Sequence, residues 1–230
     1  PYVVLLNSDA ILGMDTPNRL VDHLAAHPEV GCVGPRVNLP DGTRQPRIRG
    51  HRPSPRRAIL QSLGLSRLSP LWHGLDGIDC EGRAEPIAPV GWISGVCMAM
   101  RTSDYRAIGG FDAAFFMYCE DIDLCLRMQQ HGGKIVHVDD WPLVHLGGAS
   151  SRPIAKRLRN AVWQQRNVLD IIRRHHGRAW ALFTRLGMAP GQVLRLAAGL
   201  LRLRADERYL LRSSWVRLLD LLGALRRLPE

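Results

Sequence analysis

The sequence lacks the features that would assign it to several simple classes of protein. Its five cysteines are scattered and odd in number, at positions 32, 80, 97, 119 and 125, and no two of them form a Cys-x-x-Cys pair. This pattern excludes a disulfide framework and indicates no zinc site, so we expect a reducing, cytoplasmic location. No uninterrupted apolar run approaches the roughly 18 residues that cross a bilayer, and no secretory signal precedes the first apolar segment.

Acidic residues are scarce in the last third of the chain. Residues 151–230 hold 17 Lys and Arg against 5 Asp and Glu, whereas residues 1–150 hold 14 against 16. The basic C-terminal third contains no nucleic-acid motif, so we expect no nucleic-acid partner. With 46% hydrophobic residues, the chain can build one full core. We therefore predict a main domain over residues 1–150 and a basic helical extension over residues 151–230.

The first 35 residues predict alternating strands and helices. The apolar run Tyr2–Leu6 is typical of a strand buried on both faces of a parallel sheet, and Asn7-Ser8-Asp9 follows it. Ligands of open α/β sheets bind at this carboxyl edge. A helix is predicted from Thr16-Pro17, and a strand over Val30–Val33 that ends at Gly34-Pro35.

The pattern weakens between residues 36 and 86, where prolines, glycines and seven arginines between Arg36 and Arg57 interrupt it. This segment is either a solvated surface loop or a loop that contacts an anionic ligand, with one helix over residues 57–65. Order returns in a single predicted strand over residues 90–100, in which small residues permit close approach of a substrate.

An acidic stretch follows a short helix that is predicted to begin at Thr102 and to end at Gly109-Gly110. A second helix is predicted over residues 119–131, with Glu120 and Asp121 in its first turn. Free backbone N–H groups favour carboxylates there, which by itself would explain the charges. We expect an aromatic plug beneath this helix, formed by Phe111, Phe115 and Phe116.

The remaining chain predicts two short strands and three helices. The strands cover residues 134–138 and 143–146, and His145 in the second is either a core residue or a ligand. The helices cover residues 155–176, 191–203 and 207–228.

Four segments, in this order and spacing, resemble family 2 of the glycosyltransferases, in its rhamnosyltransferase and galactofuranosyltransferase-like branch. They are Leu6-Asn7-Ser8-Asp9, Trp92-Ile93-Ser94-Gly95 with Arg101, Gly110-Phe111-Asp112 to Glu120-Asp121-Ile122-Asp123-Leu124 with Arg127, and Val144-His145 ahead of Gly148-Ala149-Ser150. The resemblance covers residues 2–176. It implies a GT-A fold with a Rossmann-like mixed sheet, and inverting transfer of a sugar from a nucleotide sugar to a glycan or lipid-linked acceptor.

The resemblance also implies the roles of single residues in metal binding and catalysis. Asn7 and Asp9 match the donor-binding DxD-type motif, with Asn at its first position, and Asp9 matches the metal ligand. His145 matches a histidine that completes the coordination in some relatives, and such ligands suit Mn²⁺ or Mg²⁺. Asp121 matches the catalytic base.

Further residues are implied to bind the acceptor and the donor. Glu120 and Asp123 would orient the acceptor or hold the loop. Trp92, with Ser94 and Gly95, would form an acceptor-binding wall, unless Trp92 is a core residue. The guanidinium groups of Arg152 and Arg166 are candidates for gripping the donor diphosphate.

One departure from the family concerns the N-terminal nucleotide-binding half, which has no match in the sequence. We therefore expect a fold that is incomplete at its N-terminus, from a longer enzyme, and a chain that turns over little by itself. The alternative is a truncated or degenerate relative without activity that acts as a membrane-associated binding module.

Leucine and arginine alternate in residues 194–204 and 211–227. Amphipathic, arginine-bearing helices suit an anionic membrane surface, such as the inner face of the plasma membrane. The alternative is an appendage that packs on the catalytic domain or on a homodimer partner.

Overall fold

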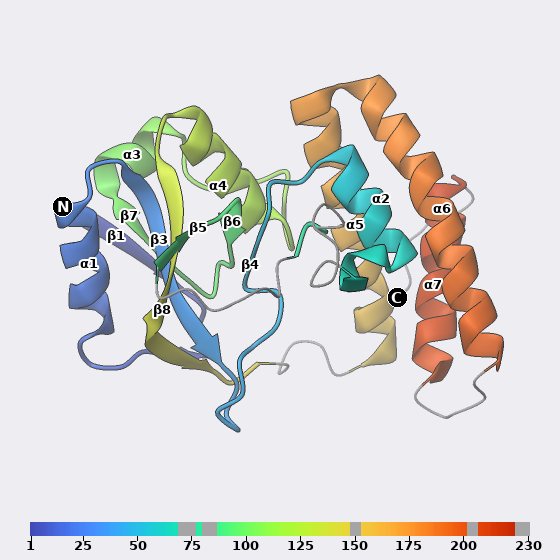
Figure 1. Cartoon of the computed structure of the whole chain (residues 1–230), viewed down its shortest axis with the longest axis horizontal. Helices are drawn as coiled ribbons and strands as arrows, with labels where there is room; N and C mark the ends of the chain where they lie inside the picture. Colours follow the sequence, from blue (N-terminus) through green and yellow to red (C-terminus); the bar gives the residue numbers. More distant parts are fainter. Residues whose placement is uncertain (69–76, 80–86, 148–152, 202–206, 224–230) are drawn as a thin grey trace. The chain divides into compact units, whose positions relative to one another are not determined.

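The computed structural model describes residues 1–68, 77–79, 87–147, 153–201 and 207–223, which form two compact units (Figure 1). The first unit comprises Pro1–Arg52 and Asp79–Ala149, and the second comprises Pro53–Ile78 and Ser150–Glu230. Residues 53–68, expected within the 1–150 segment, thus belong to the same unit as the C-terminal helices.

A mixed sheet forms the centre of the first unit. Its main strands are β1 (Tyr2–Leu6), β7 (Cys97–Arg101), β3 (Val30–Asn38), β8 (Lys134–His145) and β2 (Ala10–Ile11), which lie in that order, while β5 (Ile87–Pro89) also pairs with β8. Only β3 and β8 pair in parallel among the described strands. The predicted α/β class with a mixed sheet is confirmed.

Four details of the predicted strands are wrong. β1 is a half-exposed edge strand of the described sheet, antiparallel to β7. Strand β3 continues through Gly34-Pro35, and β8 runs unbroken through Asp139–Pro142, because a register shift between Pro35 and Val37 accommodates the proline in the ladder. The strand expected over residues 90–100 divides into β6 (Trp92–Ile93), which pairs with β4 (Arg49–Gly50), and β7.

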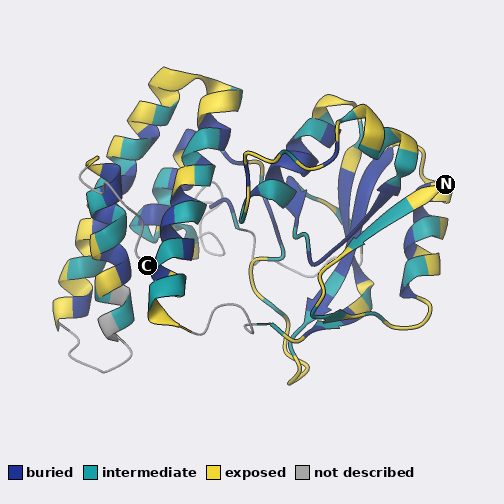
Figure 2. Ribbon diagram, turned by 180° about the vertical axis from the view of Figure 1, so that it is seen from behind, coloured by how far each residue is buried: buried dark blue, intermediate teal, exposed yellow. Residues whose placement is uncertain are grey.

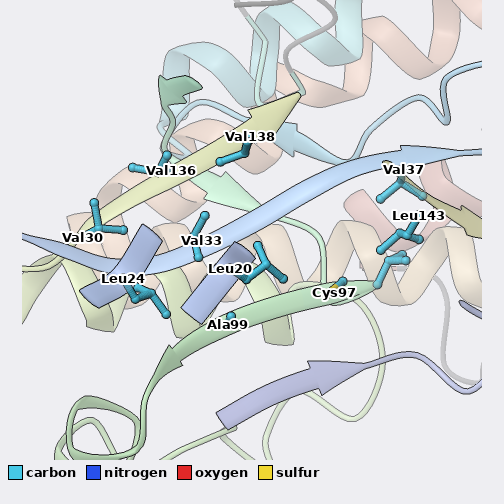
Figure 3. Packing of buried hydrophobic residues seen from close by; sticks show 11 residues of the cluster. Leu20, Leu24, Val30, Val33, Val37, Cys97, Ala99, Val136, Val138 and Leu143 are labelled. Atoms are coloured by element: carbon cyan, nitrogen blue, oxygen red, sulfur yellow. The ribbon is translucent and has the colours of Figure 1, made fainter. Parts of the chain in front are cut away.

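Helices cover the two faces of this sheet. Helix α1 (Thr16–Ala26) packs Leu20 and Leu24 into a core with Val33, Ala99 and Val136 (Figure 3). Alternate residues of the same strands point to the other face, as the period of two requires. There, Cys32 of β3 meets Cys125 of α4 (Glu120–Gln130).

The acidic helix and the short helix before it are confirmed as α4 and α3 (Thr102–Ala107). The aromatic plug is wrong for two of its three members. Phe115 is 4% exposed, but Phe111 is 40% and Phe116 is 82% exposed. Phe115 alone therefore contributes to the core.

The second unit is helical. It contains α2 (Pro55–Leu63), the 3₁₀ turn η1 (Leu65–Leu68), α5 (Ile154–His176), α6 (Arg178–Leu201) and α7 (Glu207–Leu221). Helix α6 begins 13 residues before the predicted Gly191, and Pro190 lies inside it. Gly191 packs against α2, where a Cβ atom would lie 2.3 Å from the Ser62 carbonyl oxygen, so this glycine permits close packing rather than starting a helix. None of the described helices combines the length and apolar character that a membrane crossing requires.

Candidate active site

The structure brings the predicted metal-site residues together at one end of the sheet. The pairing of β2 with β8 sets Ala10 opposite His145, and the Leu146 N–H donates to the Asp9 carbonyl oxygen at 2.9 Å. As a result, Asp9 Oδ1 lies 2.9 Å and Asn7 Nδ2 lies 3.1 Å from His145 Nε2. Residues more than 130 positions apart in the chain thus converge on one imidazole nitrogen.

Gln45 orients this imidazole from its other side. Its side-chain oxygen Oε1 lies 2.7 Å from His145 Nδ1, so Nδ1 carries the proton and donates it to Gln45. In the neutral ring, Nε2 then holds a lone pair, to which the Asn7 amide donates. The sequence analysis did not find Gln45, because nothing in the arginine-rich stretch around it marks a glutamine as functional.

The resulting arrangement fits a divalent cation. The Nε2 lone pair and Asp9 Oδ1 are both acceptors, and at 2.9 Å they need a proton or a cation between them. Oxygen and imidazole donors suit Mn²⁺ or Mg²⁺. No group of three or more His, Cys, Asp or Glu side chains with metal-binding geometry occurs in the described part of the chain. Asp9 and His145 would therefore need further ligands from a substrate or from water.

A second cluster lies at the start of α4. Cys119 precedes the helix in the left-handed conformation, with φ of 68°, and places Asp121 in the first turn. Asp121 accepts two backbone hydrogen bonds, from Gly95 N–H to Oδ2 at 3.0 Å and from Ile122 N–H to Oδ1 at 2.8 Å. Burial raises the pKa of Asp121, and these hydrogen bonds oppose the rise. The carboxylate is thus fixed in place while its affinity for a proton is increased.

Glu120 extends this cluster as a half-buried carboxylate. Burial, and then the charge of Asp121, raise the pKa of Glu120 to about 7. Its Oε2 atom is buried and has no hydrogen-bond partner among the described residues. An uncompensated carboxylate is costly for folding, so Glu120 is unlike a residue kept only for helix capping.

Asp123 has a different environment from its two acidic neighbours. It is 2% exposed, and its Oδ2 atom lies 2.7 Å from both Nε and Nη2 of Arg127. Arg127 also donates to the carbonyl oxygen of Ile108, at the end of α3. This geometry favours the predicted loop-holding role of Asp123 over contact with an acceptor.

The turn at residues 94–96 joins the two clusters. Gly95 donates to Asp121, and the next residue, Val96, accepts a hydrogen bond from Asn7 N–H at 3.0 Å. Ser94 N–H donates to the Ile48 carbonyl oxygen at 2.8 Å. The beginning of α4 and the end of β1 are therefore connected through two consecutive residues, Gly95 and Val96.

Three other residues were predicted to bind the acceptor or the donor: Trp92, Arg152 and Arg166. Trp92 is 4% exposed, which favours the core alternative. Arg166 donates from Nε to Asp220 Oδ1 at 2.7 Å in the helical unit. Arg152 lies outside the described residues. The contact of both arginines with a donor stays a prediction.

The environment of Glu120 predicts a pH-dependent stability. The folded state holds this proton more tightly than the unfolded chain, so the free energy of unfolding falls as the pH rises from about 4.5 to about 7. The stability of Glu120→Gln lacks this pH dependence. We therefore expect its free energy of unfolding, relative to that of the wild type, to be about 1–2 kcal/mol higher at pH 8 than at pH 5, after allowance for partial solvent screening. Urea unfolding at both pH values measures the gain, with the exposed Asp22→Asn as control. An equal difference at the two pH values would refute this assignment.

The fold and the two clusters together define an α/β protein with a carboxylate–imidazole pair and a second, buried carboxylate held by two backbone N–H groups. The family comparison makes the class specific. The chain belongs to Glycosyl transferase family group 2, whose family model matches residues 2–222.

Curated relatives agree with the branch that the motifs indicated. The chain is 33% identical over 147 residues to N-acetylglucosaminyl-diphospho-decaprenol L-rhamnosyltransferase of Mycobacterium tuberculosis, a match that covers 63% of this chain and 46% of that enzyme. It is 41% identical over 63 residues to rhamnosyltransferase WbbL of Escherichia coli, which covers 27% of this chain and 24% of the relative. The chain thus spans less than half the length of these relatives.

Among solved structures, the chain is similar to the mannosyltransferase PcManGT from Pyrobaculum calidifontis in complex with GDP-Man and Mn²⁺. The match has a TM-score of 0.45 and 17% identity, and covers 98% of this chain and 62% of that one.

Proposed function

We propose that this chain supplies the metal-binding and acceptor-activating residues of an inverting glycosyltransferase. The enzyme would move a sugar from a nucleotide-sugar donor to a hydroxyl group of a glycan or of a lipid-linked saccharide. The observation that carries the proposal is the convergence of Asn7 and Asp9 on His145, connected through the turn at residues 94–96 to Asp121.

On the donor side, Asp9 and His145 would hold Mn²⁺ or Mg²⁺. When bound, the ion neutralises the negative charge of the leaving diphosphate. Gln45 keeps the proton of the imidazole on Nδ1, so that Nε2 faces Asp9 as a lone pair. Asn7 matches the first position of the motif with a neutral amide, whose hydrogen bond to His145 Nε2 the ion would replace, and the donor phosphates would supply further oxygen ligands.

On the acceptor side, Asp121 would accept the proton of the attacking hydroxyl group. The hydroxyl oxygen forms a bond to the anomeric carbon while the bond to the diphosphate breaks, and this single displacement inverts the anomeric centre. The two backbone N–H groups on Asp121 hold its carboxylate in place, and burial raises its pKa, which makes it a stronger proton acceptor than a solvated carboxylate. Glu120 is the further acceptor-binding candidate, together with the backbone of Ser94 and Gly95.

The names of the two curated relatives support rhamnose as the transferred sugar and a polysaccharide or cell-wall precursor as the acceptor. A lipid-linked acceptor would place the enzyme on the inner face of the plasma membrane. A cytoplasmic, membrane-peripheral location is therefore part of the proposal.

A transfer assay tests this function. This chain, and in parallel the longest natural reading frame that contains it, is incubated with Mn²⁺, dTDP-rhamnose and a lipid-linked N-acetylglucosamine acceptor. The proposal expects a metal-dependent product in at least the longer protein, abolished by EDTA and restored by Mn²⁺, with the anomeric configuration of the donor inverted in the NMR spectrum. A product that retains the configuration, or transfer that EDTA does not affect, would overturn the mechanism.

A further inference from the structure

The solvent-exposed side of α6 is almost entirely apolar. Eleven of its exposed residues carry no charge and no polar side chain: Ala179, Trp180, Leu182, Phe183, Leu186, Pro190, Val193, Leu194, Ala197, Ala198 and Leu200. We call this set the α6 outer face. The exposed Arg178 at the first position of the helix is the one charged exposed residue of α6 up to Leu200. The exposed turns of this helix are yellow in Figure 2.

The polar residues of α6 lie instead on its packed side. Thr184 is fully buried and donates to the Trp180 carbonyl oxygen, while Gln192 is 1% exposed and donates to Ser62 Oγ of α2. Gly187, Gly191 and Gly199 also face neighbouring helices at distances that leave no room for a Cβ atom. The helix therefore turns its uncharged polar residues and three glycines inward and most of its large apolar residues outward, which is the reverse of an ordinary surface helix.

An exposed apolar surface of this kind indicates a binding partner or a membrane. Five of its large side chains, Trp180, Leu182, Phe183, Leu186 and Leu194, are between 53% and 59% exposed. A contiguous patch of this kind on a protein surface indicates contact with a protein partner or a membrane. The helix spans about 36 Å at 1.5 Å per residue, long enough to lie along a bilayer surface.

The net charge of the second unit favours anionic lipid over a second copy of the chain. The described residues of the second unit include 15 Lys and Arg against 3 Asp and Glu. Two copies of this unit, face to face, would bring like charges together, whereas anionic lipid would be attracted. We propose that the α6 outer face lies in the interface of an anionic lipid bilayer. This inference deepens the membrane location proposed above, but it rests on α6 and its surroundings alone.

A cavity beside this face offers a place for lipid phosphate. It has a volume of about 470 Å³ and is lined by residues of α5, α6 and α7, among them Arg166, Arg173 and Arg185. Asp170 and Asp220 balance two of the three guanidinium groups. Leu182 belongs both to the cavity wall and to the α6 outer face, so a headgroup at the arginines would set its acyl chains against the apolar side chains.

Vesicle sedimentation tests the inference on this 230-residue chain, without nucleotide sugar or metal, so that its outcome does not depend on sugar transfer. The probes are vesicles of phosphatidylglycerol mixed with phosphatidylcholine, and of phosphatidylcholine alone. We expect binding to the anionic vesicles that weakens with salt, and a loss of roughly tenfold or more in Phe183→Ser/Leu186→Ser/Leu194→Ser. The matched control, Met14→Ser/Leu68→Ser/Ile87→Ser, removes three exposed apolar side chains elsewhere and should bind as the wild type does.

Two results would overturn the inference. The first is a wild-type chain that does not sediment with anionic vesicles, or an α6 triple variant that sediments as well as the wild type. The second is a wild-type dimer in light scattering that the α6 variant converts to a monomer, without any vesicle binding, which would assign the face to a second copy. Circular dichroism of the variant confirms that its helices are retained.

Discussion

Replacing Asp121 by Asn is expected to lower the rate of sugar transfer by about 10²–10⁴-fold, the usual contribution of a general base. The amide keeps the size of the side chain and one acceptor oxygen for the Gly95 or Ile122 N–H, but it cannot accept the proton of the acceptor hydroxyl. The effect should appear in kcat at saturating donor, while affinity for Mn²⁺ stays as in the wild type. Initial rates and Mn²⁺ titration measure the two quantities.

The exposed Asp140 provides the matched control for this substitution. Asp140→Asn removes one exposed carboxylate of the same unit that belongs to neither cluster, and should retain full activity. If Asp121→Asn kept more than about a tenth of the wild-type rate, Asp121 would not be the base, because that loss is below the range for general-base catalysis.

Removing Asp9 or His145, the two proposed protein ligands, should strongly weaken metal binding at the cluster around His145. Asp9→Ala deletes the carboxylate, and His145→Ala deletes the imidazole, so each leaves one of the two proposed protein ligands. We expect each to weaken Mn²⁺ binding by more than about 100-fold, and Gln45→Leu to weaken it by about 10–100-fold through loss of imidazole orientation. Electron paramagnetic resonance of free Mn²⁺ measures the affinities.

The exposed His131 controls for loss of a histidine as such. His131→Ala should bind Mn²⁺ as the wild type does. Equal affinities of the wild type, Asp9→Ala and His145→Ala would show that the Asp9–His145 pair does not bind the metal.

The residues that the sequence identified best are those placed by ordered motifs. Asn7, Asp9 and His145 were predicted to act together, and the pairing of β2 with β8 brings them into contact. Asp121 was placed in the first turn of a helix, where the structure has it. One of the two hydrogen bonds that hold it comes from Gly95, a residue predicted only as acceptor-binding.

Other features depend on tertiary contacts that local patterns do not encode. The run Tyr2–Leu6 has the same composition in a parallel central strand as in the antiparallel edge strand that forms. Gln45 gains its role only because the fold sets its amide against His145. The apolar periodicity of α6 is visible in the sequence, but periodicity cannot tell which side of the helix faces its neighbours, and here the apolar side faces outward.

The most direct test of the two-cluster site is to measure both Mn²⁺ affinity and transfer rate for the wild type, Asp121→Asn and Asp9→Ala, in the protein that shows transfer. The account predicts that Asp121→Asn loses transfer alone, whereas Asp9→Ala loses both metal binding and transfer. Loss of Mn²⁺ binding in Asp121→Asn, or full transfer by Asp9→Ala, would contradict the division of the site into an acceptor-activating and a metal-binding part.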